Sequence, residues 1–136
     1  MLPYAVDVDG ALSYALLRFA AGRDRGWQPL LGEGARGQAP LEAAREAAWR
    51  VARVPRDAVF VALDSRATIE QGPQRCAVAE YAFGVRVAAG ELCPSRAEFE
   101  HRWVSYEIAD GLLHDEPDRN ALFELRRRLG RPAACC

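Results

Sequence analysis

The sequence predicts an α+β fold, with several strands and two long helices in one chain. The first helix is expected over about 41–54, because apolar residues recur there at steps of three and four. The second is expected over about 117–129, where leucines recur at the same spacing before Gly130. Strands are indicated by alternating apolar runs, most clearly over 76–89.

A β-hairpin is expected at the start of the chain. Two apolar-rich runs, over 4–8 and 11–19, are separated by Asp9-Gly10, which is a strong two-residue hairpin signal. A polar loop over 20–26 follows the hairpin. A short strand is then expected over 27–31, ahead of the first helix.

A glycine loop leads into the first helix. Gly32, Gly34 and Gly37 allow a close approach of the backbone to a ligand, and a helix N-terminus after such a loop suits an anion. Pro40 fits the first helical position, where its missing N–H has no partner to lose. Pro55 cannot extend the helix and predicts its end.

The second half of the chain predicts further strands and a short helix. Gly84 interrupts the long strand candidate, which indicates a bulge or close packing. The remaining expected elements are a buried strand over 58–63, partly continued by 65–69, a turn at Gly72-Pro73, a polar loop over 94–101, a strand over 102–106 and a short helix or turn over 107–113.

Composition bounds the class of protein. The length of 136 residues favours one domain, expected over 1–132, with 133–136 as a flexible tail. A net charge of −1 gives no bulk electrostatic case for nucleic-acid or membrane binding, and no apolar run approaches a membrane span. All 18 basic residues are arginine, which indicates GC-rich coding and a bacterial source. The lack of a signal sequence predicts a cytoplasmic protein.

The glycine loop and first helix resemble the Nudix box, whose pattern is G-x5-E-x7-R-E-U-x-E-E-x-G-U, with U apolar. Aligned from Gly32 without a gap, Gln38 stands at the first Glu, Glu46-Ala47 at the Arg-Glu pair and Arg50-Val51 at the Glu-Glu pair. With one residue deleted before the helix, Arg45-Glu46 fits the Arg-Glu pair, and Trp49-Arg50 stands at the Glu-Glu pair.

The resemblance implies a fold, an activity and a set of site residues. The fold is a mixed sheet between helices, and the activity is hydrolysis of a diphosphate bond with magnesium. A second landmark is the string EHRWVSYEIADGLL, where an acidic loop precedes a Trp-containing strand. The implied site residues are Glu46, Glu98 and Glu100 for catalysis, Glu42 and Glu46 for Mg²⁺, and Arg18, Gly32 and Arg50 for the substrate.

Three hypotheses about function follow. The first is a divergent Nudix pyrophosphohydrolase acting on a nucleoside triphosphate or a diphosphate-linked nucleoside, near the bacterial nucleoside and pterin triphosphate enzymes. The second is a non-catalytic module that binds a small nucleotide-like phosphorylated ligand and needs no cofactor, with Arg18 and Arg50 replacing the metal charge. The third is an interaction domain without a small ligand, expected as a homodimer.

Overall fold

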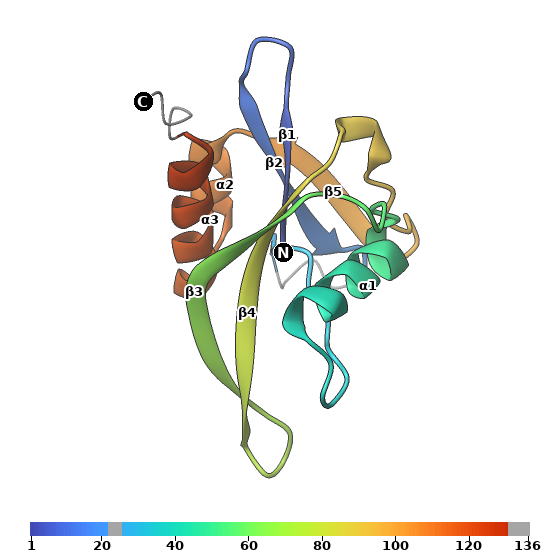
Figure 1. Cartoon of the computed structure of the whole chain (residues 1–136), viewed down its shortest axis with the longest axis vertical. Coiled ribbons are helices and arrows are strands. Elements are labelled where there is room, and N and C mark those ends of the chain that lie inside the picture. The colour runs from blue at the N-terminus through green and yellow to red at the C-terminus, as the bar shows by residue number, and fades with distance from the viewer. Residues whose placement is uncertain (22–25, 131–136) are drawn as a thin grey trace.

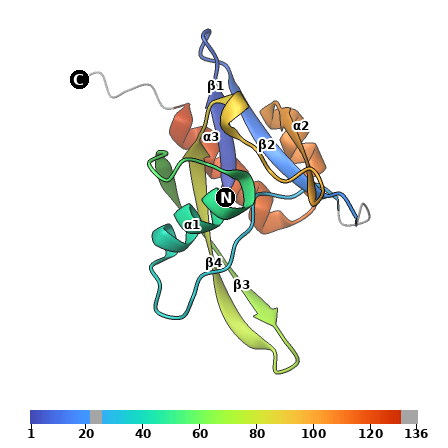
Figure 2. The same cartoon turned by 90° about the vertical axis from the view of Figure 1, so that its right-hand side faces the viewer.

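A mixed five-stranded sheet forms the middle layer of the computed structural model, with α1 on one face and α2 and α3 on the other (Figures 1 and 2). The structure describes residues 1–21 and 26–130, without the side chains of Ile69 and Gln71. The flexible tail predicted at 133–136 lies outside these residues. The elements are β1 (Leu2–Val6), β2 (Leu12–Phe19), α1 (Pro40–Ala52), β3 (Phe60–Gln71), β4 (Cys76–Arg86), the 3₁₀ turn η2 (Ala89–Glu91), β5 (Phe99–Val104), α2 (Tyr106–Leu112) and α3 (Glu116–Leu129).

The strand order is β3-β4-β1-β2-β5. β1 and β2 pair antiparallel as the predicted hairpin, but residues 7–11 connect them instead of Asp9-Gly10 alone. In this connection Asp7 Oδ1 accepts hydrogen bonds from the N–H groups of Asp9 and Ala11. β1 pairs with β4 in parallel, with Leu2 opposite Gly84. The mixed sheet between helices that the resemblance implied is therefore confirmed.

The two faces of β2 separate two hydrophobic cores, because successive side chains on a strand point to opposite faces. Tyr14 and Leu16 belong to the core that contains Leu122 and Leu125 of α3. Ala15 and Leu17 alternate with them and belong to the core that contains Ala48, Ala52 and Val54.

Gly84 packs closely against α3, as the sequence indicated. A Cβ atom at this position would lie 2.5 Å from Leu125 Cδ1. The missing side chain therefore lets α3 approach the sheet.

Several boundaries differ from the expected ones. α1 ends at Ala52, because Arg53 has a left-handed backbone (φ 57°) and its N–H donates to Trp49 O. The strand expected over 27–31 is reduced to two isolated bridges, which join Gln28 to Leu17 and Trp27 to Leu113.

The loop predicted over 94–101 is shorter than expected, because β5 begins at Phe99 and pairs with β2 from there. β3 continues to Gln71, well beyond the buried strand expected over 58–63. No helix in the described part of the chain is long and apolar enough to cross a membrane.

Candidate functional site

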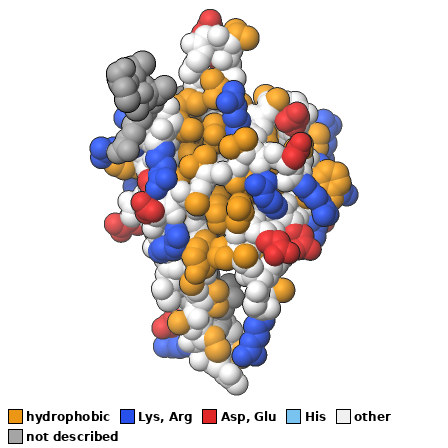
Figure 3. Space-filling view, viewed as in Figure 1, with side chains coloured by type: hydrophobic (Ala, Val, Ile, Leu, Met, Phe, Trp, Pro, Cys, Tyr) orange, Lys and Arg blue, Asp and Glu red, His pale blue; other side chains and the backbone are white. Residues whose placement is uncertain are grey.

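A cavity of ≈ 900 Å³ lies where the loop before α1, the β3–β4 hairpin and the start of α3 meet. The surface is hollowed beside the hairpin, below the apolar centre of the face shown in Figure 3. Its walls include residues 29–35 of the glycine loop, Ala43, Ala44, Ala47 and Arg50 of α1, residues 65–67 of β3, residues 78–83 of β4, and Asp118 and Asn120 of α3.

Small residues hold the glycine loop against α1. A Cβ atom at Gly32 would overlap the Cβ of Ala47, which is itself only 1% exposed. A Cβ at Gly34 would lie 3.0 Å from the Cβ of Ala43. Glycine in the loop and alanine on the helix therefore permit the close contact that forms this wall of the cavity.

Gln38 connects the loop to the helix by side-chain hydrogen bonds. Its Nε2 donates to Glu46 Oε2 at 2.7 Å, and its Oε1 accepts from the Ala35 N–H at 2.9 Å. Glu46 is therefore engaged by Gln38, which lines the cavity, whereas Glu46 itself does not line it.

The face of α1 that lines the cavity supplies no carboxylate. Glu42 and Glu46 are both exposed, and Arg50 is the charged side chain of α1 at the cavity wall. Magnesium near a phosphate needs hard oxygen ligands. Within residues 1–21 and 26–130 there is no group of three His, Cys, Asp or Glu side chains that could hold a metal ion. The donors that α1 presents to the cavity therefore do not fit Mg²⁺.

Arg18 and Glu100 lie together but away from α1. They face each other across the β2–β5 pairing and form an ion pair, and the Arg18 guanidinium lies 4.6 Å from the centre of the Trp27 ring. By strand alternation, Arg18 shares the sheet face of Tyr14 and Leu16, which is the α3 side. The sheet therefore separates Glu100 from Glu46.

Glu98 lies just before β5 and is exposed. Its backbone carbonyl accepts a hydrogen bond from the Ala20 N–H at 2.9 Å. Neither Glu98 nor Glu100 lines the cavity, so the three predicted catalytic acids do not meet at one point. Of the predicted substrate residues, Gly32 and Arg50 line the cavity, and Arg18 does not.

The wall formed by β3 and β4 contains an arginine and a tyrosine that the sequence did not indicate as site residues. Arg66 of β3 and Tyr81 of β4 stack with the guanidinium 4.7 Å from the ring centre, and both line the cavity. The polar composition of 64–75 favoured a loop there, although 65–69 was expected to continue the strand in part. The position of Arg66 depends on how β3 pairs with β4 and on the register shift just before it, and no local pattern in the sequence indicated that shift.

Asp118 in the first turn of α3 has an altered acidity. Burial raises its pKa to about 6, with further contributions from the nearby carboxylates of Glu80 and Asp115, against the opposing effect of the N-terminal amine. Glu80 and Asp118 both line the cavity. β4 and α3 therefore each contribute one carboxylate to the cavity wall, whereas α1 contributes Arg50.

Comparison with solved structures identifies the fold. A protein from Listeria monocytogenes assigned to the Nudix hydrolases shares 27% identity over 94% of this chain and 90% of that chain, with a TM-score of 0.78. The dihydroneopterin triphosphate pyrophosphohydrolase of E. coli gives 15% identity, 92% coverage of each chain and a TM-score of 0.74. The C. elegans Ap4A hydrolase in a binary complex gives 15% identity, 94% and 93% coverage, and a TM-score of 0.72.

These similarities show that the chain has the Nudix hydrolase fold, as the loop and helix indicated. No model of a known protein family matches the sequence, and no curated protein matches it. The chain is thus similar to Nudix hydrolases in its fold, and to the first of these relatives also in sequence.

Proposed function

We propose that this protein binds a nucleotide-like phosphorylated small molecule in the cavity beside α1, with Arg50 supplying the positive charge. One observation carries the proposal: at the cavity wall, α1 presents Ala47 and Arg50 at two positions where the Nudix box, aligned without a gap, has acids. An arginine binds phosphate oxygens by charge-assisted hydrogen bonds and needs no metal ion for it. A cavity of ≈ 900 Å³ is within the range of sites that hold small ligands.

A thermal-shift panel of nucleoside mono-, di- and triphosphates, each with Mg²⁺ and with EDTA, tests the proposal. We expect at least one nucleotide to raise the melting temperature equally under both conditions. Arg50→Gln should abolish the shift. Arg56→Gln is the matched control, because Arg56 is also an exposed arginine near Trp49 but does not line the cavity. No shift with any nucleotide would contradict the proposal.

A second candidate is hydrolysis of a diphosphate bond, which the Nudix hydrolase fold favours. It assigns Glu46, Glu98 and Glu100 to catalysis, and Glu42 with Glu46 to Mg²⁺. Release of phosphate or pyrophosphate from the same nucleotides tests it. Magnesium-dependent release that Glu46→Gln abolishes would support this candidate over simple binding. A cytoplasmic location and a homodimer remain predictions of the sequence.

A further inference from the structure

The pairing of β3 with β4 is interrupted beside the cavity. Ala62 lies opposite Phe83 and Arg66 lies opposite Tyr81, so β3 advances four residues while β4 advances two. The residues between these pairs, Leu63 to Ser65, form a bulge. Bulges bend a strand and redirect the side chains that follow. Arg66 is the first residue after this bulge.

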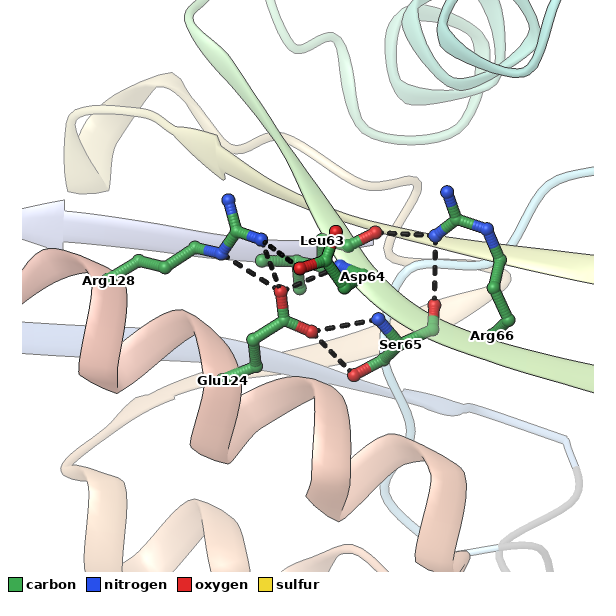
Figure 4. Close-up of polar contacts among 6 residues, drawn as sticks. All are labelled: Leu63, Asp64, Ser65, Arg66, Glu124 and Arg128. Carbon is green, nitrogen blue, oxygen red and sulfur yellow. Dashed lines mark hydrogen bonds and ion pairs between the residues drawn. The ribbon is translucent and has the colours of Figure 1, made fainter.

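A carboxylate from α3 holds the bulge. Glu124 Oε2 accepts a hydrogen bond from the Asp64 N–H at 2.7 Å, and Glu124 Oε1 accepts from the N–H and Oγ of Ser65 at 2.8 and 2.7 Å (Figure 4). Arg128, one helical turn further on, donates to Glu124 at 2.9 Å and contacts Asp64 at 3.0 Å. Two backbone N–H groups that the bulge removes from the β ladder thus find their acceptor on α3.

The acidity of Glu124 agrees with this arrangement. Burial would raise the pKa of its carboxyl group, but the hydrogen bonds from Asp64 and Ser65 and the charge of Arg128 outweigh burial and lower the pKa. Glu124 therefore accepts these hydrogen bonds as a carboxylate at neutral pH.

Arg66 is fixed on the other side of the same bulge. It extends away from Arg128, and its Nη1 donates to the carbonyl oxygens of Leu63 and Ser65 (Figure 4). Its guanidinium stacks on Tyr81 at the cavity wall. The backbone N–H groups of the bulge thus donate to Glu124, and its backbone carbonyl groups accept from Arg66.

We propose that Arg66 is a second ligand-binding cation of the cavity and that Glu124 is the positioning residue that keeps it there through the β3 bulge. Arg50 and Arg66 reach the same cavity from α1 and from β3. Two guanidinium groups on separate walls suit a ligand with two or more linked phosphates better than a monophosphate. This inference rests on the proposed function, because it names the chemical class of ligand for the same cavity.

The test combines binding and hydrogen exchange on the full chain. Affinities for AMP, ADP and ATP are measured in EDTA for the wild type, Arg66→Gln, Arg66→Lys and Glu124→Gln. Arg66→Gln should weaken ADP and ATP by about tenfold and AMP by less than about threefold, and Arg66→Lys should recover part of the loss. Arg75→Gln, on the same hairpin but outside the cavity, should leave all three affinities unchanged.

Hydrogen exchange without ligand reports on the positioning role. Glu124→Gln should accelerate exchange about tenfold or more around residues 62–68, and leave the amides of α1 unchanged. It should also weaken ADP binding by about threefold or more. Glu116→Gln, an exposed carboxylate change on the same helix, is the control and should alter neither.

The outcomes separate the two proposals. Unchanged exchange in Glu124→Gln would overturn its positioning role, whatever the binding result. Faster exchange with unchanged ADP affinity would show that the bulge does not set the ligand site and would overturn the inference. If the wild type binds none of the three nucleotides, the proposed function fails, and the ligand-binding role of Arg66 fails with it. Faster exchange would then still support Glu124 as the residue that fixes the bulge.

Discussion

Gln38 and Glu46 are joined by a hydrogen bond of 2.7 Å between the glycine loop and α1. In the alignment of the Nudix box without a gap, these two residues stand at the first Glu and at the Arg of the Arg-Glu pair. A Glu and an Arg at the same two positions could form an ion pair across the same contact. The contact therefore favours the gapless alignment, in which Ala47, Arg50 and Val51 stand at the acidic positions of the helix.

Replacing Gln38 and Glu46 by the residues of the Nudix box should reveal an energetic coupling between the two side chains. Gln38→Glu alone places two carboxylates at hydrogen-bond distance and should destabilise the protein by about 0.5–1 kcal/mol. Glu46→Arg alone removes the acceptor of the Gln38 hydrogen bond and should destabilise the protein by less than Gln38→Glu does. The double variant should recover stability, with a coupling energy of about 0.5–1 kcal/mol in urea unfolding. Strictly additive effects would mean that the two side chains do not interact.

Gly32→Ala should destabilise the loop and helix contact. The added Cβ would overlap the Cβ of Ala47, a short side chain that cannot rotate away. Overpacking of this kind costs about 1–3 kcal/mol in the free energy of unfolding. Gly90→Ala is the control, because a Cβ there meets nothing within 4 Å. Equal stability of the two variants would contradict the packing described for the loop.

Leu125→Ala should be strongly destabilising. Leu125 is fully buried and fills the space above Gly84, so its truncation leaves a cavity between α3 and the sheet. The expected loss is about 2–5 kcal/mol by urea unfolding. Phe123→Ala on the same helix should cost less than about 1 kcal/mol, because Phe123 is 48% exposed. A small loss of stability in Leu125→Ala would contradict the described packing of α3 on the sheet.

Asp118 should make the stability depend on pH in the direction opposite to that of an ion-paired carboxylate. Its pKa is raised from an ordinary 3.8 to about 6 in the folded state, so between these two values the folded state carries more protons than the unfolded state. Stability should therefore fall as pH rises from about 4 through 6. Because solvent reaches part of the side chain, the loss should be about 1 kcal/mol.

Asp118→Asn should remove this pH dependence and be more stable than the wild type at pH 8. Urea unfolding at pH 4.5 and pH 8 measures both effects. Asp57→Asn, which removes the same charge from an exposed turn, is the control and should keep the slope of the wild type. If the stability of the wild type rises between pH 4.5 and 7 and Asp118→Asn removes that rise, the direction of the pKa shift given for Asp118 is wrong.

The sequence predicted which helices and strands exist better than it predicted where they begin and end or which elements they pack against. The hairpin at Asp9-Gly10, α1, the long β4 strand and α3 each carry a local signal that is strong over many residues. The start of β5 could not be placed from its polar residues, because pairing with β2 decides where that strand begins. Glu100 was therefore expected in a loop and is found in the strand beside Arg18.

Of the residues that line the cavity, the sequence singled out only those in the loop and helix that resemble the box. Gly32 and Arg50 line the cavity because the loop and helix place them there. Arg66, Tyr81 and Asp118 come from elements that are distant in the sequence, and tertiary packing alone brings them to the same cavity. Local sequence patterns carry no information about such tertiary contacts.

Calorimetric titration of ADP into the wild type and into Arg50→Gln, each in EDTA and in Mg²⁺, tests the central claim most directly. The account predicts binding to the wild type with the same Kd in both solutions, and a loss of about tenfold or more in Arg50→Gln. ADP binding that requires Mg²⁺ and is unaffected by Arg50→Gln would contradict it.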